Sequence, residues 1–225
     1  MKAIVASTLL LCTFVLATGD LQCSHTEPLY LTNPRWDDMV DPCVNVMRKQ
    51  IKTELNAAMQ YLAMGAHFSK DVVNRPGFAK MFFESASEER QHAIKLISYL
   101  LMRGELVSDV SSLIDTRALF EKINWTKWES GLSALKNALT LEALVTKDIK
   151  NVIEVCEGHT NKKRQNQEEV NDYHLVDYLT GEFLEEQYKG QRDLAGKVST
   201  LSKFMTDHGD LGEFLFDKKL LKGDL

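Results

Sequence analysis

The chain has 225 residues, of which 44% are hydrophobic and 26% charged, proportions typical of a globular domain with a substantial core. Its 32 acidic side chains outnumber the 27 basic ones, and the resulting net charge of -5 argues against a nucleic-acid-binding surface. The 12 glycines and 4 prolines exclude collagen-like and proline-rich disordered chains.

The first residues predict a targeting segment. A basic start is followed by an apolar run over 3–16 and by small residues at 17–19, a position suited to cleavage. The run is too short for a spanning helix, which needs about 20 apolar residues, so we expect no membrane span. The sequence predicts a signal peptide over 1–19, an N-terminal extension over 20–41 and a folded domain over 42–225, secreted or in the secretory-pathway lumen.

Two features suit this oxidising compartment. Removal of the leader leaves an odd number of cysteines, Cys23, Cys43 and Cys156. Cys23 and Cys43 flank the extension, and closing that loop would contribute about 3 kcal/mol; other pairings and three unpaired thiols remain open alternatives. Asn124 begins an Asn-Trp-Thr sequon and is a candidate glycosylation site.

Hydrophobic periodicity predicts an all-α fold. Asp41 is the expected N-cap of the first helix, with Pro42 in its first turn, and Gly158 is expected to end the third. The expected helices are 42–69, 76–103, 128–156 and 169–200, with a short fifth helix over 211–221. The connection over 104–127 could extend about 79 Å, enough to return along a helix about 42 Å long. These features predict a four-helix bundle with one long crossover connection.

One polar side chain interrupts the apolar stripe of each long helix near its middle. These residues are Glu54, Glu89, Glu142 and Gln187. Since helices of similar length bring their midpoints to one level, we expect the four to meet in the core. Buried carboxylates without a partner cost several kcal/mol, so the pattern predicts a bound cation.

The spacing of neighbouring residues indicates which cation. Glu89 and His92 form a Glu-x-x-His pair on one helix face, and Tyr61 returns to the face of Glu54 as a hydroxyl donor. Carboxylates with one imidazole suit iron or manganese better than zinc, and a di-iron centre fits. The fourth helix offers Leu184-x-x-Gln187 where a permanent di-iron site carries a second Glu-x-x-His. We therefore expect the second iron to be held loosely, as substrate in transit.

The sequence resembles the ferritins, and among them the heavy-type subunits of secreted insect ferritins, from about residue 42 to 221. The segments that carry the resemblance are 51–55 (IKTEL), 87–93 (SEERQHA), 128–132 (WESGL), 138–142 (ALTLE), 185–187 (EEQ) and 215–218 (LFDK).

This resemblance implies a shell of twenty-four subunits that stores iron. It implies a ferroxidase centre with Glu54, Glu89 and His92 at the first iron, Glu89 bridging, and Glu142 at the second iron with Gln187 beside it. Tyr61 would be a hydrogen-bonding neighbour. Fe(II) and dioxygen would be the substrates, and the product a ferric oxide mineral in the cavity.

The resemblance is incomplete at two other sites. Glu88 matches a cavity-side carboxylate that helps to nucleate mineral, but the equivalent positions Gln91 and Ile94 are not acidic. Asp177 matches an acidic residue of the three-fold pore through which iron enters, while the second acidic position is Thr180. A homologous light-type subunit in the same shell is the expected partner, and the remaining thiol could join the two.

Two other classes of protein share parts of this pattern. A rubrerythrin-like di-iron peroxidase would carry the second Glu-x-x-His and in many cases a Cys-x-x-Cys module, and the sequence has neither. A secreted helical cytokine shares the bundle and the leader, but has no reason to bury three glutamates at one level. Gel filtration separates both from a large shell.

Overall fold

The computed structural model describes residues 37–105, 113, 128–158 and 171–224, which form long helices without a strand among them. The helices are α1 (Asp41–Phe68), α2 (Pro76–Met102), α5 (Gly131–Cys156), α6 (Tyr173–Tyr178), the π-helical η3 (Leu179–Leu184), α7 (Glu185–His208) and α8 (Asp210–Lys222). The predicted all-α four-helix bundle with a short fifth helix is confirmed. Among the described residues, no helix is long and apolar enough to cross a membrane.

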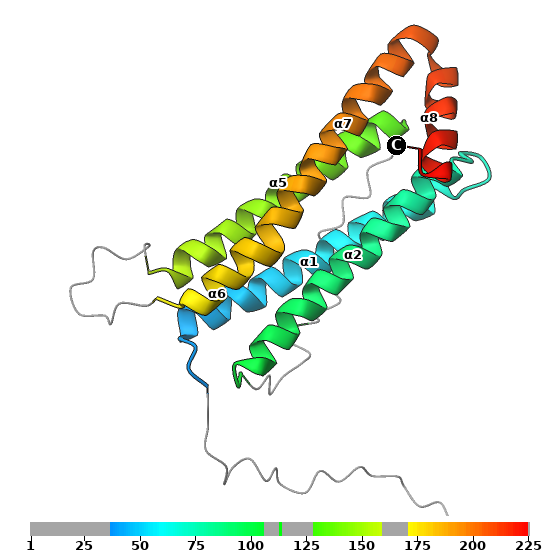
Figure 1. Cartoon of the computed structure of the whole chain (residues 1–225). Helices are drawn as coiled ribbons and strands as arrows, with labels where there is room; N and C mark the ends of the chain where they lie inside the picture. The colour runs from blue at the N-terminus through cyan, green and yellow to red at the C-terminus, as the bar shows by residue number, and fades with distance from the viewer. Residues whose placement is uncertain (1–36, 106–112, 114–127, 159–170, 225) are drawn as a thin grey trace, which may run out of the picture. The chain divides into compact units, whose positions relative to one another are not determined.

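The bundle is built from two helix pairs. α1 packs along α2, α5 packs on α7, and α1 also contacts α5 (Figure 1). α8 lies across one end and contacts both α2 and α7. Most of the predicted crossover over 104–127 lies outside the described residues.

Two predicted helix starts differ from the structure. α1 begins at Asp41 itself, and its N-cap is Val40, whose side chain offers no capping bond. Asp41 instead places a negative charge in the first turn, where it interacts favourably with the positive end of the helix dipole. The fourth helix begins at Tyr173, not 169, because the Asp172 side chain accepts a hydrogen bond from the backbone N–H of Leu175.

The fourth helix also runs further than predicted and changes its winding. α6, η3 and α7 follow one another without a break and end at His208, eight residues beyond the predicted 200. Gly209 turns the chain into α8 with a positive φ of 55°. The π-helical turn shifts the register of the helix just before Gln187.

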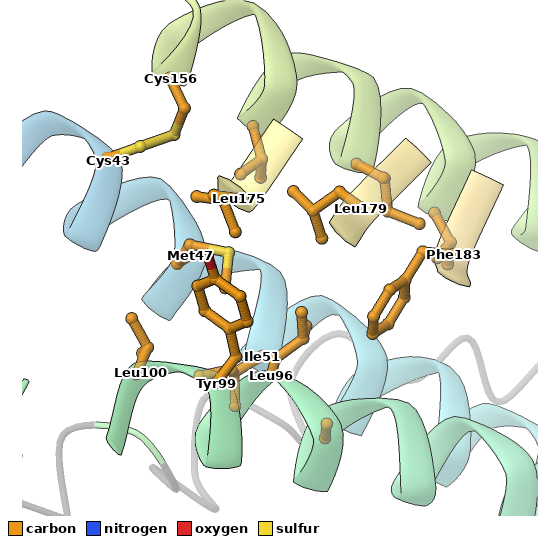
Figure 2. Close-up of a cluster of buried hydrophobic side chains, with 14 of the residues drawn as sticks. Cys43, Met47, Ile51, Leu96, Tyr99, Leu100, Cys156, Leu175, Leu179 and Phe183 are labelled. Carbon is orange, nitrogen blue, oxygen red and sulfur yellow. A yellow bond between two sulfur atoms is a disulfide. The ribbon is translucent and has the colours of Figure 1, made fainter. Parts of the chain in front are cut away.

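The apolar core falls into two clusters on either side of the predicted polar level. One contains Met47, Ile51, Leu96, Tyr99 and Phe183, which converge from different helices in Figure 2. The other is rich in aromatic side chains, and its largest fully buried members are Tyr61, Phe68, Phe78, Phe82 and Phe216. The mid-helix polar residues lie in sequence between members of the two clusters.

Two buried carboxylates of α8 cap the starts of other helices. Asp217 Oδ1 accepts hydrogen bonds from the backbone N–H groups of Gly77 (2.8 Å) and Phe78 (3.1 Å). Glu213 accepts one from the N–H of Gly131 at 2.9 Å and one from Arg75 Nε at 3.2 Å. These bonds satisfy donors at the N-termini of α2 and α5, so α8 is fixed to the end of the bundle.

The predicted pairing of Cys43 with Cys23 is wrong, because Cys43 forms a disulfide with Cys156. Cys43 lies in the first turn of α1 and Cys156 at the end of α5, and the two Cα atoms are 5.2 Å apart. Cys23 lies outside the described residues. The bridge joins positions 113 residues apart.

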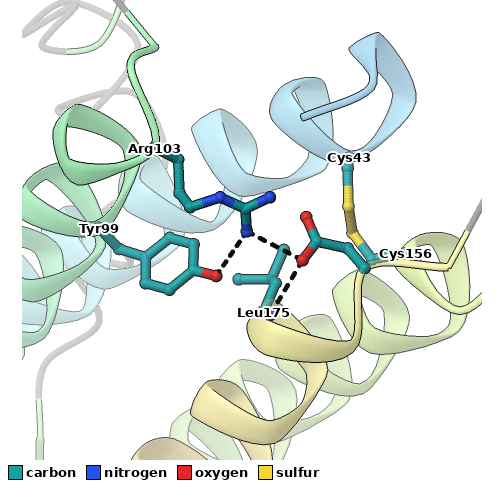
Figure 3. Close-up of a disulfide and its surroundings, with 6 residues drawn as sticks. Cys43, Tyr99, Arg103, Cys156 and Leu175 are labelled. Carbon is teal, nitrogen blue, oxygen red and sulfur yellow. Dashed lines mark hydrogen bonds and ion pairs between the residues drawn. A yellow bond between two sulfur atoms is a disulfide. The ribbon is translucent and has the colours of Figure 1, made fainter. Parts of the chain in front are cut away.

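Arg103 reinforces the same end of the bundle (Figure 3). Its Nη1 donates to the Tyr99 hydroxyl and to Asp172 Oδ1, both at 2.9 Å. Its Nη2 donates to Asp38 Oδ1 at 2.7 Å. The ends of α2, α1 and α6 are thereby held together beside the disulfide.

Candidate metal centre

The four long helices bring the predicted polar residues to one place in the core. Glu54 comes from α1, Glu89 and His92 from α2, Glu142 from α5 and Gln187 from α7. All are buried, from 0% exposed at Glu54 to 8% at Glu142. The bundle therefore places three carboxyl groups, an imidazole and an amide between its two apolar clusters.

The first part of the centre is formed by α1 and α2. Glu54, Glu89 and His92 each offer a ligand atom, and these three atoms all lie within 4.8 Å of one another. His92 Nδ1 is 3.4 Å from Glu89 Oε2. Gln50 Nε2 donates to Glu54 Oε1 at 2.8 Å, whereas Glu54 Oε2 is buried without a hydrogen-bond partner.

The second part is formed around Glu142. The Tyr61 hydroxyl donates a hydrogen bond to Glu142 Oε1. The Gln187 side chain lies near the same carboxyl group and opposes the rise of its pKa. The Gln187 oxygen points the other way, since Thr146 Oγ1 donates to Gln187 Oε1 at 2.8 Å. Glu142 is thus held by a donor from α1, with the Gln187 amide of α7 nearby.

Burial makes all three carboxyl groups reluctant to ionise in the metal-free protein. Burial raises the pKa of Glu54 well above its ordinary value, and the nearby Glu89 adds to the rise. Burial and the charge of Glu142 raise the pKa of Glu89 to about 8. The pKa of Glu142 is also raised by burial, although the bonds from Tyr61 and Gln187 oppose the shift. A cation at this point would reverse these shifts by stabilising the ionised forms.

The donor set fits a hard or intermediate cation such as iron. Carboxylate oxygens and one imidazole nitrogen are the available ligands, and no thiol is among them. The orphaned Glu54 Oε2 is an acceptor that a cation would satisfy. Glu54, Glu89 and His92 would hold one cation, and Glu142 with the shared Glu89 a second.

A pocket of about 330 Å³ connects this centre to the surface between α2 and α7. Glu89, His92, Glu142 and Gln187 line it. Glu88, the predicted nucleation residue, is exposed and lines the same pocket. The acidic side of α2 therefore gives direct access to the buried carboxylates.

Sequence reasoning missed several neighbours of the centre. Gln50 fixes Glu54, Thr146 contacts Gln187, and Glu186 lies with its Oε2 3.3 Å from His92 Nε2. Gln50 and Thr146 lie four residues from Glu54 and Glu142, and the Gln50 and Thr146 side chains are buried. A polar residue one helical turn from a predicted ligand was the available signal.

Other predicted residues lie elsewhere. Leu184 packs against the apolar cluster and does not line the pocket of the centre, because it ends the π-helical turn. Asp177 and Thr180 are exposed and line a separate pocket of about 310 Å³. Asn124 lies outside the described residues.

Comparison with known proteins identifies the family. The model of the ferritin-like domain matches residues 44–204. A ferritin heavy chain of Papilio xuthus is 55% identical over 225 residues, which is the full length of both chains. The chain belongs to the ferritin family.

Other ferritins agree with this identification. A heavy chain of Trichoplusia ni is 61% identical over 190 residues, 84% of each chain, and one of Drosophila melanogaster is 51% identical over 98% of this chain and all of its own length. The crystal structure of Trichoplusia ni secreted ferritin matches with a TM-score of 0.79 and 59% identity, covering 89% of this chain and 98% of that chain.

Proposed function

We propose that this chain is the ferroxidase subunit of a secreted ferritin, which oxidises Fe(II) with dioxygen and stores the product as a ferric mineral inside a multi-subunit shell. The proposal rests on the convergence of Glu54, Glu89, His92 and Glu142 from three helices at one buried place beside a pocket. Membership of the ferritin family and the heavy-chain names of the relatives support it.

Different residues of the centre bind the two Fe(II) ions. Glu54 and His92 hold the first ion, Glu142 holds the second, and Glu89 bridges the two because its carboxyl group lies between these groups. Gln50 occupies Glu54 Oε1 and leaves Oε2 for iron. Binding displaces protons from the buried carboxyl groups. Each Fe(II) then gives up one electron, and dioxygen accepts the pair.

Release of the oxidised iron follows from the weakness of the second position. An amide at Gln187 donates less electron density to Fe(III) than a carboxylate or imidazole would. The pocket between α2 and α7 leads from the centre past Glu88 and Glu186. We propose that the oxidised iron leaves through this pocket. We propose that Fe(II) enters the shell past Asp177, at a junction between subunits.

The shell and its partner are also part of the proposal. α8 exposes Leu211, Phe214, Leu215 and Leu221, an apolar set that a neighbouring subunit would cover. A light-type subunit would supply the acidic groups missing at Gln91, Ile94 and Thr180, in a shell of twenty-four subunits. Cys23 is the thiol available for a bond between subunits. The Cys43–Cys156 disulfide suits a secreted protein, as do the leader over 1–19 and a glycan at Asn124.

Gel filtration combined with an iron-uptake assay tests this function. A shell that converts Fe(II) to a retained ferric mineral in air is the expected result. A monomeric bundle, as expected of a cytokine, or a particle that oxidises no iron would reject the proposal. Mass spectrometry of the secreted protein shows whether cleavage after residue 19 and glycosylation of Asn124 occur.

A further inference from the structure

The Thr146 hydroxyl of α5 contacts two polar side chains of α7, Gln187 and Gln191. Its Oγ1 is 2.8 Å from Gln187 Oε1 and accepts a hydrogen bond from Gln191 Nε2 at 2.5 Å. It is also 2.8 Å from the backbone carbonyl oxygen of Glu142, one turn earlier in α5. Thr146 and Gln187 are both buried. The hydroxyl thus has three protein partners.

The number of protons determines how these partners can be satisfied. A hydroxyl has one hydrogen to donate and two lone pairs to accept with. Gln191 uses one lone pair, so the hydrogen goes either to Gln187 Oε1 or to the Glu142 carbonyl oxygen. In this structure the Gln187 oxygen faces Thr146. The NH₂ side of the amide is then left for the Glu142 carboxyl group, whose pKa Gln187 lowers.

In the opposite orientation of the Gln187 amide, the Thr146 hydroxyl makes three hydrogen bonds, one more than in the observed orientation. The terminal torsion of glutamine is broad and roughly two-fold. After a half-turn, Gln187 Nε2 donates to the free lone pair of Thr146, whose hydrogen passes to the Glu142 carbonyl oxygen. Gln187 Oε1 then points at the Glu142 carboxylate, an arrangement that two oxygens disfavour unless a cation lies between them.

We propose that Thr146, oriented by Gln191, is a reversible support that lets Gln187 present its NH₂ group to an empty second iron position and its oxygen to a filled one. This inference rests on the proposed ferroxidase function. Thr146 and Gln191 are positioning residues, since neither lines the pocket of the centre. Because the amide must turn before it binds, the second position is weaker than the first and releases its ion more readily.

Titration of the assembled, metal-free protein with Zn(II), which undergoes no redox reaction, tests the support. Thr146→Val keeps the shape but removes the hydroxyl, and we expect about three- to tenfold weaker binding of the second Zn(II), the loss of one buried hydrogen bond, with the first unchanged. Thr146→Ser should restore the parent affinity. Thr140→Val is the matched control, since the exposed Thr140 hydroxyl bonds only the Lys136 carbonyl oxygen. Equal second-site affinity in Thr146→Val and the parent would overturn the inference.

A second variant distinguishes the hydrogen-bonding role of Thr146 from the electrostatic effect of an added negative charge. A carboxylate at position 191 can only accept, so Gln191→Glu should take the Thr146 hydrogen, fix the Gln187 oxygen toward the metal and strengthen the second Zn(II) site. This gain should disappear in a Thr146→Val background. If Gln191→Glu still strengthens Zn(II) binding in the Thr146→Val background, the gain is a charge effect, which would overturn the inference.

A crystal structure of the Zn(II)-loaded protein gives a readout independent of affinity. We expect one Gln187 atom within about 2.2 Å of the second Zn(II), which only its oxygen can be. A structure in which the second Zn(II) is bound but Gln187 does not contact it would overturn the role of Thr146. It would leave the ferroxidase proposal intact. A parent protein that binds only one Zn(II) and oxidises no Fe(II) would overturn both.

Discussion

The Tyr61 hydroxyl on α1 donates a hydrogen bond to Glu142 Oε1 on α5, across the centre of the bundle. It links two helices at the level where the carboxylates converge. Its partner is an acid whose ionised form this bond stabilises.

Removing this hydroxyl should weaken the second metal position. In Tyr61→Phe the ring still fills its place in the aromatic cluster, but the pKa of Glu142 rises further because one opposing hydrogen bond is lost. We expect about tenfold weaker Zn(II) binding at the Glu142 side near neutral pH and slower Fe(II) oxidation, from the loss of a bond to a charged group. Tyr188→Phe, on the exposed surface of α7, is the control. Parent-like binding in Tyr61→Phe would contradict the role assigned to the bond.

Metal binding should release protons in a pH-dependent way. The pKa of Glu89 is raised to about 8, so at pH 7 the metal-free protein carries a proton that a cation must displace. Proton release should fall as pH rises through 8, while the apparent affinity increases up to that point. Calorimetry of Zn(II) binding in buffers of different ionisation enthalpy measures this, and Glu89→Gln should release fewer protons. Release that does not change between pH 6 and 9 would argue against the shifted pKa.

The same shifts give the metal-free protein a defined stability profile. Between the ordinary carboxyl pKa of 4.5 and about 8, the folded protein binds more protons at Glu89 than the unfolded chain does. The free energy of unfolding should therefore fall as pH rises through this range. Denaturant unfolding at pH 5 and pH 8 tests the direction, with saturating Zn(II) expected to abolish the difference. An increase with pH in the metal-free protein would contradict the burial of protonated carboxyl groups.

The contact between α8 and the start of α2 should tolerate no side chain at Gly77. A Cβ there would lie 2.0 Å from the backbone oxygen of Asp217. We expect Gly77→Ala to destabilise the bundle by about 1–3 kcal/mol, because the helices must move apart. Gly196→Ala in α7 meets nothing within 4 Å and should be neutral or stabilising. Thermal unfolding compares the two, and equal midpoints would show that the close approach is absent in solution.

Loss of the Cys43–Cys156 bridge should lower stability without removing the metal centre. We expect Cys156→Ser to cost about 2–5 kcal/mol, since the bridge closes a long loop, while Cys23→Ser should leave the unfolding midpoint near that of the parent. Peptide mapping under non-reducing conditions identifies the pairing directly. A linked peptide containing Cys23 and Cys43 would contradict it.

The sequence predicted the long helices well, because an apolar stripe at a spacing of three and four residues is a local property. The same periodicity exposed Glu54, Glu89 and Glu142 as interruptions and so placed them together. Helix starts were predicted less accurately, since capping at Asp172 depends on one side chain, and the start of α1 at Asp41 has no side-chain capping bond.

Features that depend on tertiary contacts were not predictable in the same way. Cys43 and Cys156 are 113 residues apart and meet only because α1 and α5 place their ends together. The π-helical turn has no periodic signature, so the sequence did not indicate that Leu184 packs against the apolar cluster. Thr146 and Gln191 became visible only when the packing of α5 on α7 brought their polar atoms together.

The initial rate of Fe(II) oxidation by the assembled protein in air, compared between the parent and the double variant Glu89→Ala, His92→Ala, shows whether the buried cluster is the ferroxidase centre. Circular dichroism and gel filtration first establish that the variant keeps its helices and its assembly. We expect rapid oxidation to be lost, because the carboxylate and the imidazole proposed to bind the first iron are both removed. An assembled double variant that oxidises Fe(II) as fast as the parent would contradict the assignment of this buried cluster as the ferroxidase centre.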